Sequence, residues 1–119
     1  MDSKVDREPA RDPQELAIKL VRSENAGDAK GMALLYEPDA VLACGGGRKA
    51  IGRDAIEAFY ADLIATGRKF DLVDQRPAML CGDIALTSTR LPNGTVTAEI
   101  ARRQTDGTWL WVIDQPSIT

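Results

Sequence analysis

The chain has 119 residues, 44% of them hydrophobic and 28% charged, which is typical of one globular domain with a single core. The net charge of −3 excludes the broad basic surface that holds nucleic acid or an anionic membrane. The chain has no histidine, so it lacks the commonest general base and metal ligand. Any acid–base chemistry must therefore be done by carboxylates, tyrosine, lysine or cysteine.

The first residues are mostly charged, and we expect residues 1–11 to form a flexible tail ahead of a single domain at residues 12–119. The tail has no apolar stretch of the kind found in a signal peptide. No run of about 18 apolar residues occurs, so we expect no membrane span and a location in the cytosol. Cys44 and Cys81 lie far apart in apolar segments and are expected to be small buried hydrophobic residues.

Three helices are predicted in the first half of the chain. Asp12 fits the N-cap of a helix that stops at Gly27, with Pro13 at its first turn. A second, shorter helix follows Asp28 and ends before Pro38. The third runs from about Arg53 to Ala65 and carries an apolar face at helical spacing.

Strands are predicted around the third helix. Ala40–Cys44 suits a buried strand, and Gly45–Gly47 reads as a flexible break after it. Beyond residue 69 the hydrophobic period changes to two, which predicts strands at Phe70–Val73, Ala78–Cys81, Ile84–Leu91, Thr95–Gln104 and Thr108–Ile113. The dipeptides Gly82-Asp83, Asn93-Gly94 and Asp106-Gly107 fit turns between them. Helices first and strands later favour an α+β fold with the helices on one face of a sheet.

Several short motifs carry a family resemblance. Ala26-Gly27-Asp28, Tyr36-Glu37-Pro38-Asp39-Ala40-Val41 and Ile51-Gly52-Arg53-Asp54-Ala55-Ile56 resemble the nuclear transport factor 2-like superfamily. The ending, with Asp106-Gly107-Thr108-Trp109 and then Val112-Ile113-Asp114, looks like its SnoaL-like and ketosteroid isomerase-like branches. From Asp12 to Thr119, the resemblance implies an α+β domain in which a curved antiparallel sheet forms a cone-shaped cup with the three helices. It also implies a homodimer.

The resemblance to ketosteroid isomerases can be carried over position by position. The family's oxyanion-binding tyrosine would fall at Leu20, and its catalytic base near Ala43. Its hydrogen-bond-donating carboxylic acid falls at Glu99, and a supporting tyrosine on the third helix matches Tyr60. Two of the three principal positions thus carry hydrocarbon, so we do not expect the chain to isomerise steroids.

Strand alternation brings several polar residues to one face of the predicted sheet. Two-residue turns at Asp106-Gly107 and Asn93-Gly94 would place Glu99 opposite both Asp114 and Ser88. The same face would hold Ile84, Leu86, Ser88, Glu99, Ala101, Leu110, Val112 and Asp114. A three-residue turn with a bulge at Gly107 or Gly94 would swap the faces of one strand.

We expect this face to line a pocket for a small apolar ligand, with Glu99 and Asp114 as the catalytic acid–base pair. Tyr60, Ser88, Leu20 and Val112 would contact the substrate. Two carboxyl groups close together in an apolar cup cannot both ionise readily, so one pKa should rise. The alternative is that Glu99 or Asp114 pairs with Arg90 or Arg103, or reaches water at the rim.

Two functional classes remain open from the sequence. One is a cofactor-free enzyme of isomerisation, cyclisation or hydration; the other is a non-catalytic ligand-binding or dimerisation module. No metal or organic cofactor is expected, because the chain has no histidine, no thiolate cluster and no dinucleotide fingerprint. We expect a homodimer formed through the other face of the sheet, with Ile100, Trp109, Trp111 and Ile113 as its apolar residues.

Overall fold

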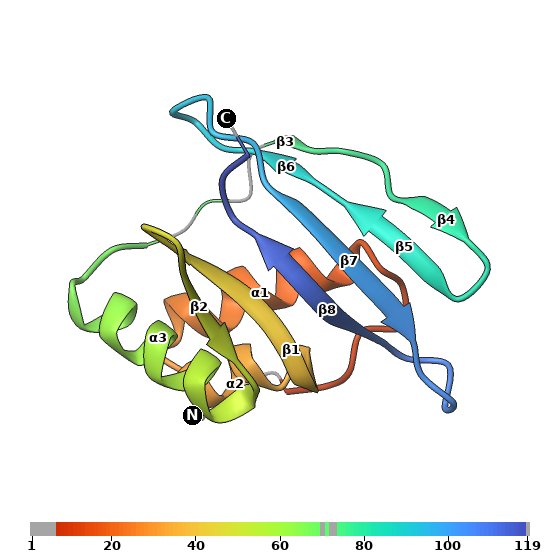
Figure 1. Cartoon of the computed structure of the whole chain (residues 1–119), viewed down its shortest axis with the longest axis horizontal. Coiled ribbons are helices and arrows are strands. Elements are labelled where there is room, and N and C mark those ends of the chain that lie inside the picture. The colour runs from red at the N-terminus through yellow and green to blue at the C-terminus, as the bar shows by residue number, and fades with distance from the viewer. Residues whose placement is uncertain (1–6, 70, 72–73, 119) are drawn as a thin grey trace.

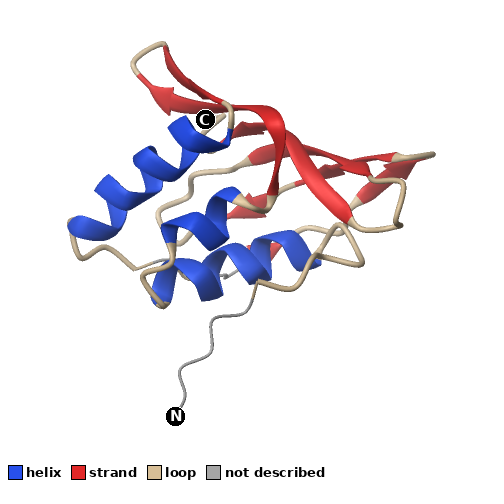
Figure 2. Ribbon diagram, turned by 90° about the horizontal axis from the view of Figure 1, so that it is seen from below, coloured by secondary structure: helices blue, strands red, loops and turns tan. Residues whose placement is uncertain are grey.

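The computed structural model describes residues 7–69, 71 and 74–118. Within them, a layer of helices lies against one face of a curved sheet (Figures 1 and 2). The helices are α1 (Glu15–Asn25), α2 (Ala29–Ala33) and α3 (Arg53–Ala65). The larger sheet contains β1 (Tyr36–Gly45), β2 (Arg48–Ile51), β4 (Met79–Cys81), β5 (Ile84–Thr87), β7 (Ala98–Arg103) and β8 (Trp109–Gln115). β3 (Asp74–Gln75) pairs with β6 (Thr89–Arg90) as a separate two-stranded ribbon.

The order of strands in the larger sheet is β2-β1-β8-β7-β5-β4, and the α+β fold class predicted from the sequence is confirmed. The sheet is mixed, however, because β1 and β8 run parallel while the other neighbours are antiparallel. A parallel pair needs a long connection between its strands. Here the whole segment from β2 to β7 separates β1 from β8 in the sequence, so hairpin signals gave no indication of this pairing.

The first helix starts later than predicted: Gln14, and not Asp12, is the N-cap of α1, and it makes no side-chain capping bond. The Asp12 carboxylate accepts a hydrogen bond from the Gln14 N–H at 2.9 Å, and the Glu15 carboxylate accepts one from the Arg11 N–H, also at 2.9 Å. These side chains satisfy backbone donors ahead of the first turn, and α1 begins at Glu15. The third helix has the bounds predicted for it.

Gly45–Gly47 forms a tight turn where we expected a flexible break. It joins β1 to β2 in an antiparallel hairpin, and all three glycines have positive φ. β2 itself was not predicted, because a four-residue strand with charged side chains has little hydrophobic period. Strands were also predicted at Phe70–Val73 and Ile84–Leu91. Most of Phe70–Val73 lies outside the described residues, and Ile84–Leu91 is divided at Ser88 into β5 and β6.

The expected tail is partly folded onto the domain. Ala10 is fully buried and forms a β-bridge with Trp109, whose N–H donates to the Ala10 carbonyl at 2.8 Å. The Arg7 guanidinium donates two hydrogen bonds to Asp28, at 3.0 and 2.8 Å. The start of β8 extends beyond its pairing with β1, and Ala10 occupies that vacant edge. Residues 7–11 therefore belong to the folded domain.

The core lies between the helices and the inner face of the sheet, the face toward them. Its largest fully buried apolar side chains come from α1, α2, α3, β1 and β8; they are Leu16, Met32, Tyr36, Leu42, Ile56 and Trp111. This packing fixes the curvature of the sheet around the helices. It also leaves the opposite, outer face without cover.

One row of apolar side chains crosses all six strands of the larger sheet on the outer face. We call it the outer row; it consists of Ile51, Val41, Ile113, Ile100, Leu86 and Met79, each the register partner of the next. Four of its members, at positions 51, 79, 86 and 113, are exposed. A continuous apolar row of this kind is uncommon on the free surface of a monomer.

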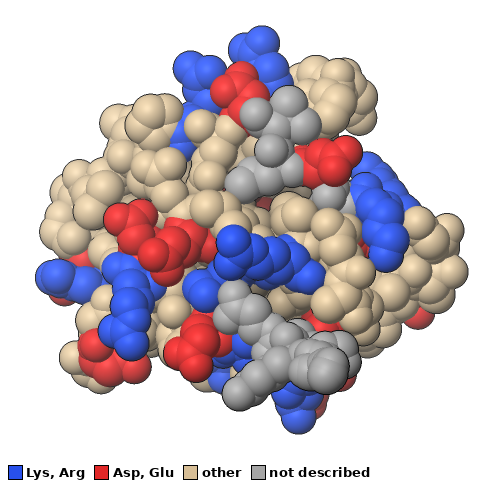
Figure 3. Space-filling view, turned by 180° about the vertical axis from the view of Figure 1, so that it is seen from behind, with Lys and Arg blue, Asp and Glu red and all other residues tan. Residues whose placement is uncertain are grey.

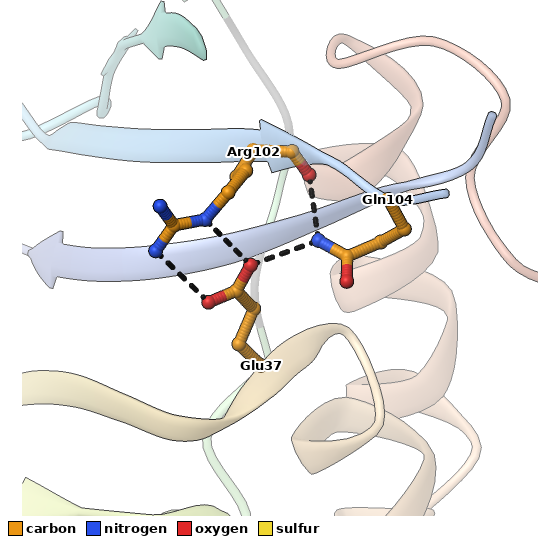
Figure 4. Close-up of polar contacts among 3 residues, drawn as sticks. All are labelled: Glu37, Arg102 and Gln104. Carbon is orange, nitrogen blue, oxygen red and sulfur yellow. Dashed lines mark hydrogen bonds and ion pairs between the residues drawn. The ribbon is translucent and has the colours of Figure 1, made fainter. Parts of the chain in front are cut away.

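A polar cluster lies beside the outer row. The Arg102 guanidinium on β7 reaches across β8 to the Glu37 carboxylate on β1, with hydrogen bonds of 2.9 and 3.2 Å (Figure 4). The Gln104 side chain donates to the same carboxylate at 2.8 Å. Although partial burial opposes it, these bonds hold the pKa of Glu37 below its ordinary value. The cluster links β7 and the residue after it to β1, across the strand β8 that lies between them.

Candidate functional site

The hairpin between β7 and β8 determines which side chains face the helices. Its turn has three residues, since the Gln104 N–H donates to the Thr108 carbonyl and the Gly107 N–H donates to the Gln104 carbonyl. Gly107 adopts φ 86°, as this kind of turn requires. A second irregularity follows at Val112, which has no register partner on β7. The two irregularities cancel, so Glu99 still lies opposite Asp114, as predicted.

Between these irregularities the faces of β8 are swapped relative to the prediction. Trp109 and Trp111 are 5% and 1% exposed and lie on the inner face. They are therefore not available for the dimer surface we assigned to them, while Ile100 and Ile113 do lie on the outer face. Val112 is the bulge residue and, contrary to the predicted face, does not line the cavity described below.

The turn between β6 and β7 also changes which side chains face the helices. The Leu91 N–H donates to the Thr95 carbonyl, leaving a three-residue loop with Gly94 at φ 88°. The register moves by one residue, and Thr87 rather than Ser88 pairs with Glu99. The Ser88 hydroxyl instead donates to the Thr97 carbonyl at 2.7 Å and lies away from the cavity lining. Contrary to the prediction, Ser88 therefore does not lie on the face that lines the cavity.

A cavity of about 570 Å³ lies between the helices and the inner face of the sheet, within the size range of small-molecule sites. Helices α1 and α3 supply an apolar wall of Ala17, Leu20, Val21, Phe59 and Leu63. The sheet supplies a hydroxyl-bearing wall of Thr89, Thr95 and Thr97. Besides Thr89, four lining residues are buried, and they form the floor: Tyr60, Glu99, Trp111 and Asp114.

Of the six predicted site residues, the cavity thus brings together Glu99, Asp114, Tyr60 and Leu20. Glu99 is 6% exposed, and its carboxylate accepts a hydrogen bond of 2.5 Å from the Thr87 hydroxyl. That hydroxyl in turn accepts a bond of 3.2 Å from the Trp111 indole N–H. Burial raises the pKa of Glu99, against the opposing effect of hydrogen bonds from Thr87 and Thr97. The hydrogen bonds thus favour the ionised form of Glu99, whereas burial favours its protonated form.

Asp114 is 5% exposed and has a different set of partners. The Tyr36 hydroxyl donates to its carboxylate at 2.5 Å, and the hydroxyls of Tyr36 and Tyr60 share a hydrogen bond of 2.7 Å. Burial, and then repulsion from Glu99, raise the pKa of Asp114 to about 8 despite the bond from Tyr36. Near neutral pH, Asp114 therefore holds its proton. Glu99 differs in that burial alone raises its pKa, while two hydrogen bonds oppose the rise.

Tyr36 is the site residue that sequence reasoning missed. It starts β1, is fully buried, and connects Tyr60 on α3 with Asp114 on β8. Burial raises its pKa well above the ordinary value, so it remains a hydroxyl donor. The sequence offered one signal: Tyr36 opens a motif that carried the family resemblance, but that motif indicated only fold.

The arginine pairing that we weighed as an alternative is not found among the described residues. Arg103 forms an ion pair with Asp83, Arg102 pairs with Glu37, and no described cation pairs with Glu99 or Asp114. The described part of the chain also contains no group of three histidine, cysteine, aspartate or glutamate side chains positioned to hold a metal ion. No helix in the same residues has the length and apolar character needed to cross a membrane.

Comparison with known proteins identifies the fold. No family model matches the chain, and no curated protein matches it by sequence. Solved structures match closely. A protein like nuclear transport factor 2, with a cystatin-like fold, from Novosphingobium aromaticivorans has a TM-score of 0.61 and 24% identity, over 84% of this chain and 75% of that chain. The chain has a nuclear transport factor 2-like fold.

Two other solved structures with similar folds are described by different roles. A ketosteroid isomerase-like protein from Erwinia carotovora atroseptica has a TM-score of 0.62 and 20% identity, over 85% of this chain and 88% of that one. A putative calcium/calmodulin-dependent protein kinase type II association domain from Thiobacillus denitrificans has a TM-score of 0.70 and 15% identity. The match covers 90% of this chain and 93% of that one. The resemblance inferred from the sequence is confirmed at the level of fold, which by itself hosts unrelated functions.

Proposed function

We propose that this protein binds a small, largely apolar molecule in the cavity and moves a proton on it with Glu99 and Asp114. One observation carries the proposal: two buried carboxyl groups at opposite register positions both line the cavity. Pairs of carboxyl groups with different environments divide the roles of acid and base, because one stays protonated while the other ionises. Proton transfer of this kind needs no cofactor, and cofactor-free chemistry remains our prediction.

The hydrogen bonds suggest which group has which role. An ionised Glu99 would remove a proton from a carbon beside a carbonyl, and the electron pair of that C–H bond would move toward the carbonyl oxygen. Asp114, protonated near neutral pH because its pKa is about 8, would donate to that oxygen. Return of the proton at another carbon completes an isomerisation. The same acid would protonate a double bond in a cyclisation or a hydration, with Tyr60 as a neighbouring hydrogen-bonding group.

Deuterium exchange into an apolar ketone tests the proton transfer directly. 2-Tetralone is a suitable probe, and loss of its α-proton signals in D₂O is followed by NMR. We expect the wild-type protein to accelerate the exchange and Glu99→Gln to reduce that acceleration by about 100-fold. Asp62→Asn, an exposed position on α3 outside the cavity lining, is the matched control and should exchange as wild type does. Equal rates for Glu99→Gln and wild type would contradict the proposal.

The second candidate is a non-catalytic ligand-binding or dimerisation module. It is favoured by the hydrocarbon at Leu20 and Ala43, the positions where the isomerase resemblance would require a tyrosine and a base. Leu20 lines the cavity and Ala43 does not. This candidate predicts that wild type and Glu99→Gln bind apolar ligands with similar affinity and that neither accelerates exchange.

We also propose that two copies of the chain associate through the outer row. The proposal is supported by the continuity of the row across six strands and by the exposure of its members. A twofold axis would bring one outer row against the other and remove both from water. The cytosolic location remains a prediction from the sequence.

A further inference from the structure

The cavity changes character from its floor to its mouth. The lining residues at the floor are buried, whereas several others are exposed to solvent and form the mouth. The charged residues at the mouth are Arg68, Lys69 and Asp71, all in the segment after α3. The mouth thus has a net charge of +1, although the whole chain has a net charge of −3.

The positive charge at the cavity mouth is local and is not part of a broad basic surface. Seen from behind, basic and acidic side chains are interspersed over the face of the molecule (Figure 3). An excess of positive charge at one opening therefore acts on what enters the cavity, because charge around a concave site has most effect on a ligand that passes it.

The two walls restrict the ligand further. The helical wall is hydrocarbon, while the opposite wall presents threonine side chains from β6 and from the loop before β7. The Thr97 hydroxyl already accepts a bond from the Thr89 N–H at 2.9 Å. No such bond occupies the hydroxyls of Thr89 and Thr95 within the described residues, so they are available to a ligand's polar edge.

We propose that the ligand of this cavity is a small organic anion with an apolar body. Its carboxylate, sulfonate or phosphate group lies at the mouth beside Arg68 and Lys69, and a neutral carbonyl or hydroxyl group reaches the floor. The orientation follows from charge, because an anionic group at the floor would meet Glu99, whereas at the mouth it meets two cations. The proposal rests on the proposed function in using the same cavity, but it adds the ligand's charge and direction.

Two fluorescent probes with the same rings test the charge preference. 8-Anilino-1-naphthalenesulfonate is an organic anion, and N-phenyl-1-naphthylamine is the same molecule without the sulfonate. We expect wild type to bind the sulfonate about five-fold more tightly, the size of effect given by exposed charge pairs. Replacing both cations, Arg68→Gln with Lys69→Gln, should remove that preference and leave binding of the neutral probe unchanged. Asp71→Asn should improve binding of the sulfonate about two-fold.

Two further variants keep the result interpretable. Arg76→Gln removes an exposed arginine that pairs with Asp74 and lies outside the lining, and it should leave the binding of both probes as in wild type. Leu63→Trp fills the cavity from α3 and should abolish the binding of both probes. Equal affinity for the two probes, with both lost in Leu63→Trp, overturns the anion proposal and leaves the proposed function standing. Undiminished binding in Leu63→Trp overturns both.

Discussion

The two faces of the sheet carry opposite chemistry at adjacent positions. On the inner face, Glu99 and Asp114 are buried opposite each other; one residue away, Ile100 and Ile113 form the neighbouring pair on the outer face. Acidic groups are thus inside and hydrocarbon outside, the reverse of what stability alone favours. This difference is what the two proposals would require: a ligand bound at the inner face and a second subunit packed on the outer face.

We expect the largest effect from removing the acid of the inner-face pair, Glu99 and Asp114. Asp114→Asn retains the side-chain shape and can still accept the bond from Tyr36, but it has no proton to transfer. We expect exchange into 2-tetralone to fall by about 100-fold or more, while the free energy of unfolding at pH 7 is unchanged or higher. Parallel rate and urea-denaturation measurements check this. A large loss of stability together with activity would mean that Asp114 has a structural role.

The outer face is tested by introducing a charge. Ile113→Lys places an ammonium in the middle of the outer row, and we expect dissociation of the dimer, because burying two unpaired charges opposes association. Sedimentation should give twice the 12.9 kDa chain mass for wild type and the chain mass for the variant. Ile118→Lys is the control, since Ile118 is 55% exposed against 50% for Ile113 and lies outside the row. A wild-type monomer at tens of micromolar would contradict the proposal.

The pH dependence of the free energy of unfolding tests the acid pair on the inner face. In the unfolded chain Asp114 ionises near pH 4, whereas in the folded protein its pKa is about 8. Between these pH values the folded state therefore binds one proton more than the unfolded chain. The contribution of Asp114 to the free energy of unfolding is complete below pH 4 and is lost as the pH rises toward 8. Glu99→Gln removes the neighbouring charge that helps raise this pKa. It should cost nothing at pH 5 and add about 1 kcal/mol at pH 7.5, as measured by melting curves. A clear loss at pH 7.5 would instead indicate that the Glu99 carboxylate stabilises the fold through its hydrogen bonds with Thr87 and Thr97.

Tyr36→Phe should have the smallest effect. It removes the hydroxyl that connects Tyr60 with Asp114, so the hydrogen bond that lowers the pKa of Asp114 disappears. The alkaline limb of any pH–rate profile should shift upward, and the free energy of unfolding should fall by about 1 kcal/mol. Tyr60→Phe provides the comparison, because it leaves the bond from Tyr36 to Asp114 intact. An unshifted profile in Tyr36→Phe would exclude Tyr36 as a positioning residue.

The partnership of Glu99 with Asp114 was predicted from a two-residue turn, and it is observed because the longer turn and the bulge at Val112 cancel. The sequence by itself determined the fold class and the helix positions. These depend on local information: hydrophobic period, helix-start residues and turn dipeptides. Leu20 and Tyr60 were also predicted at the cavity, on the strength of the family resemblance. Ser88, Val112 and the two tryptophans were misplaced because a turn dipeptide does not fix turn length, and a one-residue change reverses which face a side chain occupies.

Only the tertiary structure decided which residues surround the acid pair. The bulge at Val112 turns Trp111 and Asp114 to the same face, and it occurs where β8 must satisfy both β7 and the parallel strand β1. Tyr36 meets Asp114 across 78 positions of sequence, through a strand pairing that no local pattern indicates. The raised pKa of Asp114 has the same origin, since burial and the approach of Glu99 exist only once the helices close over the sheet.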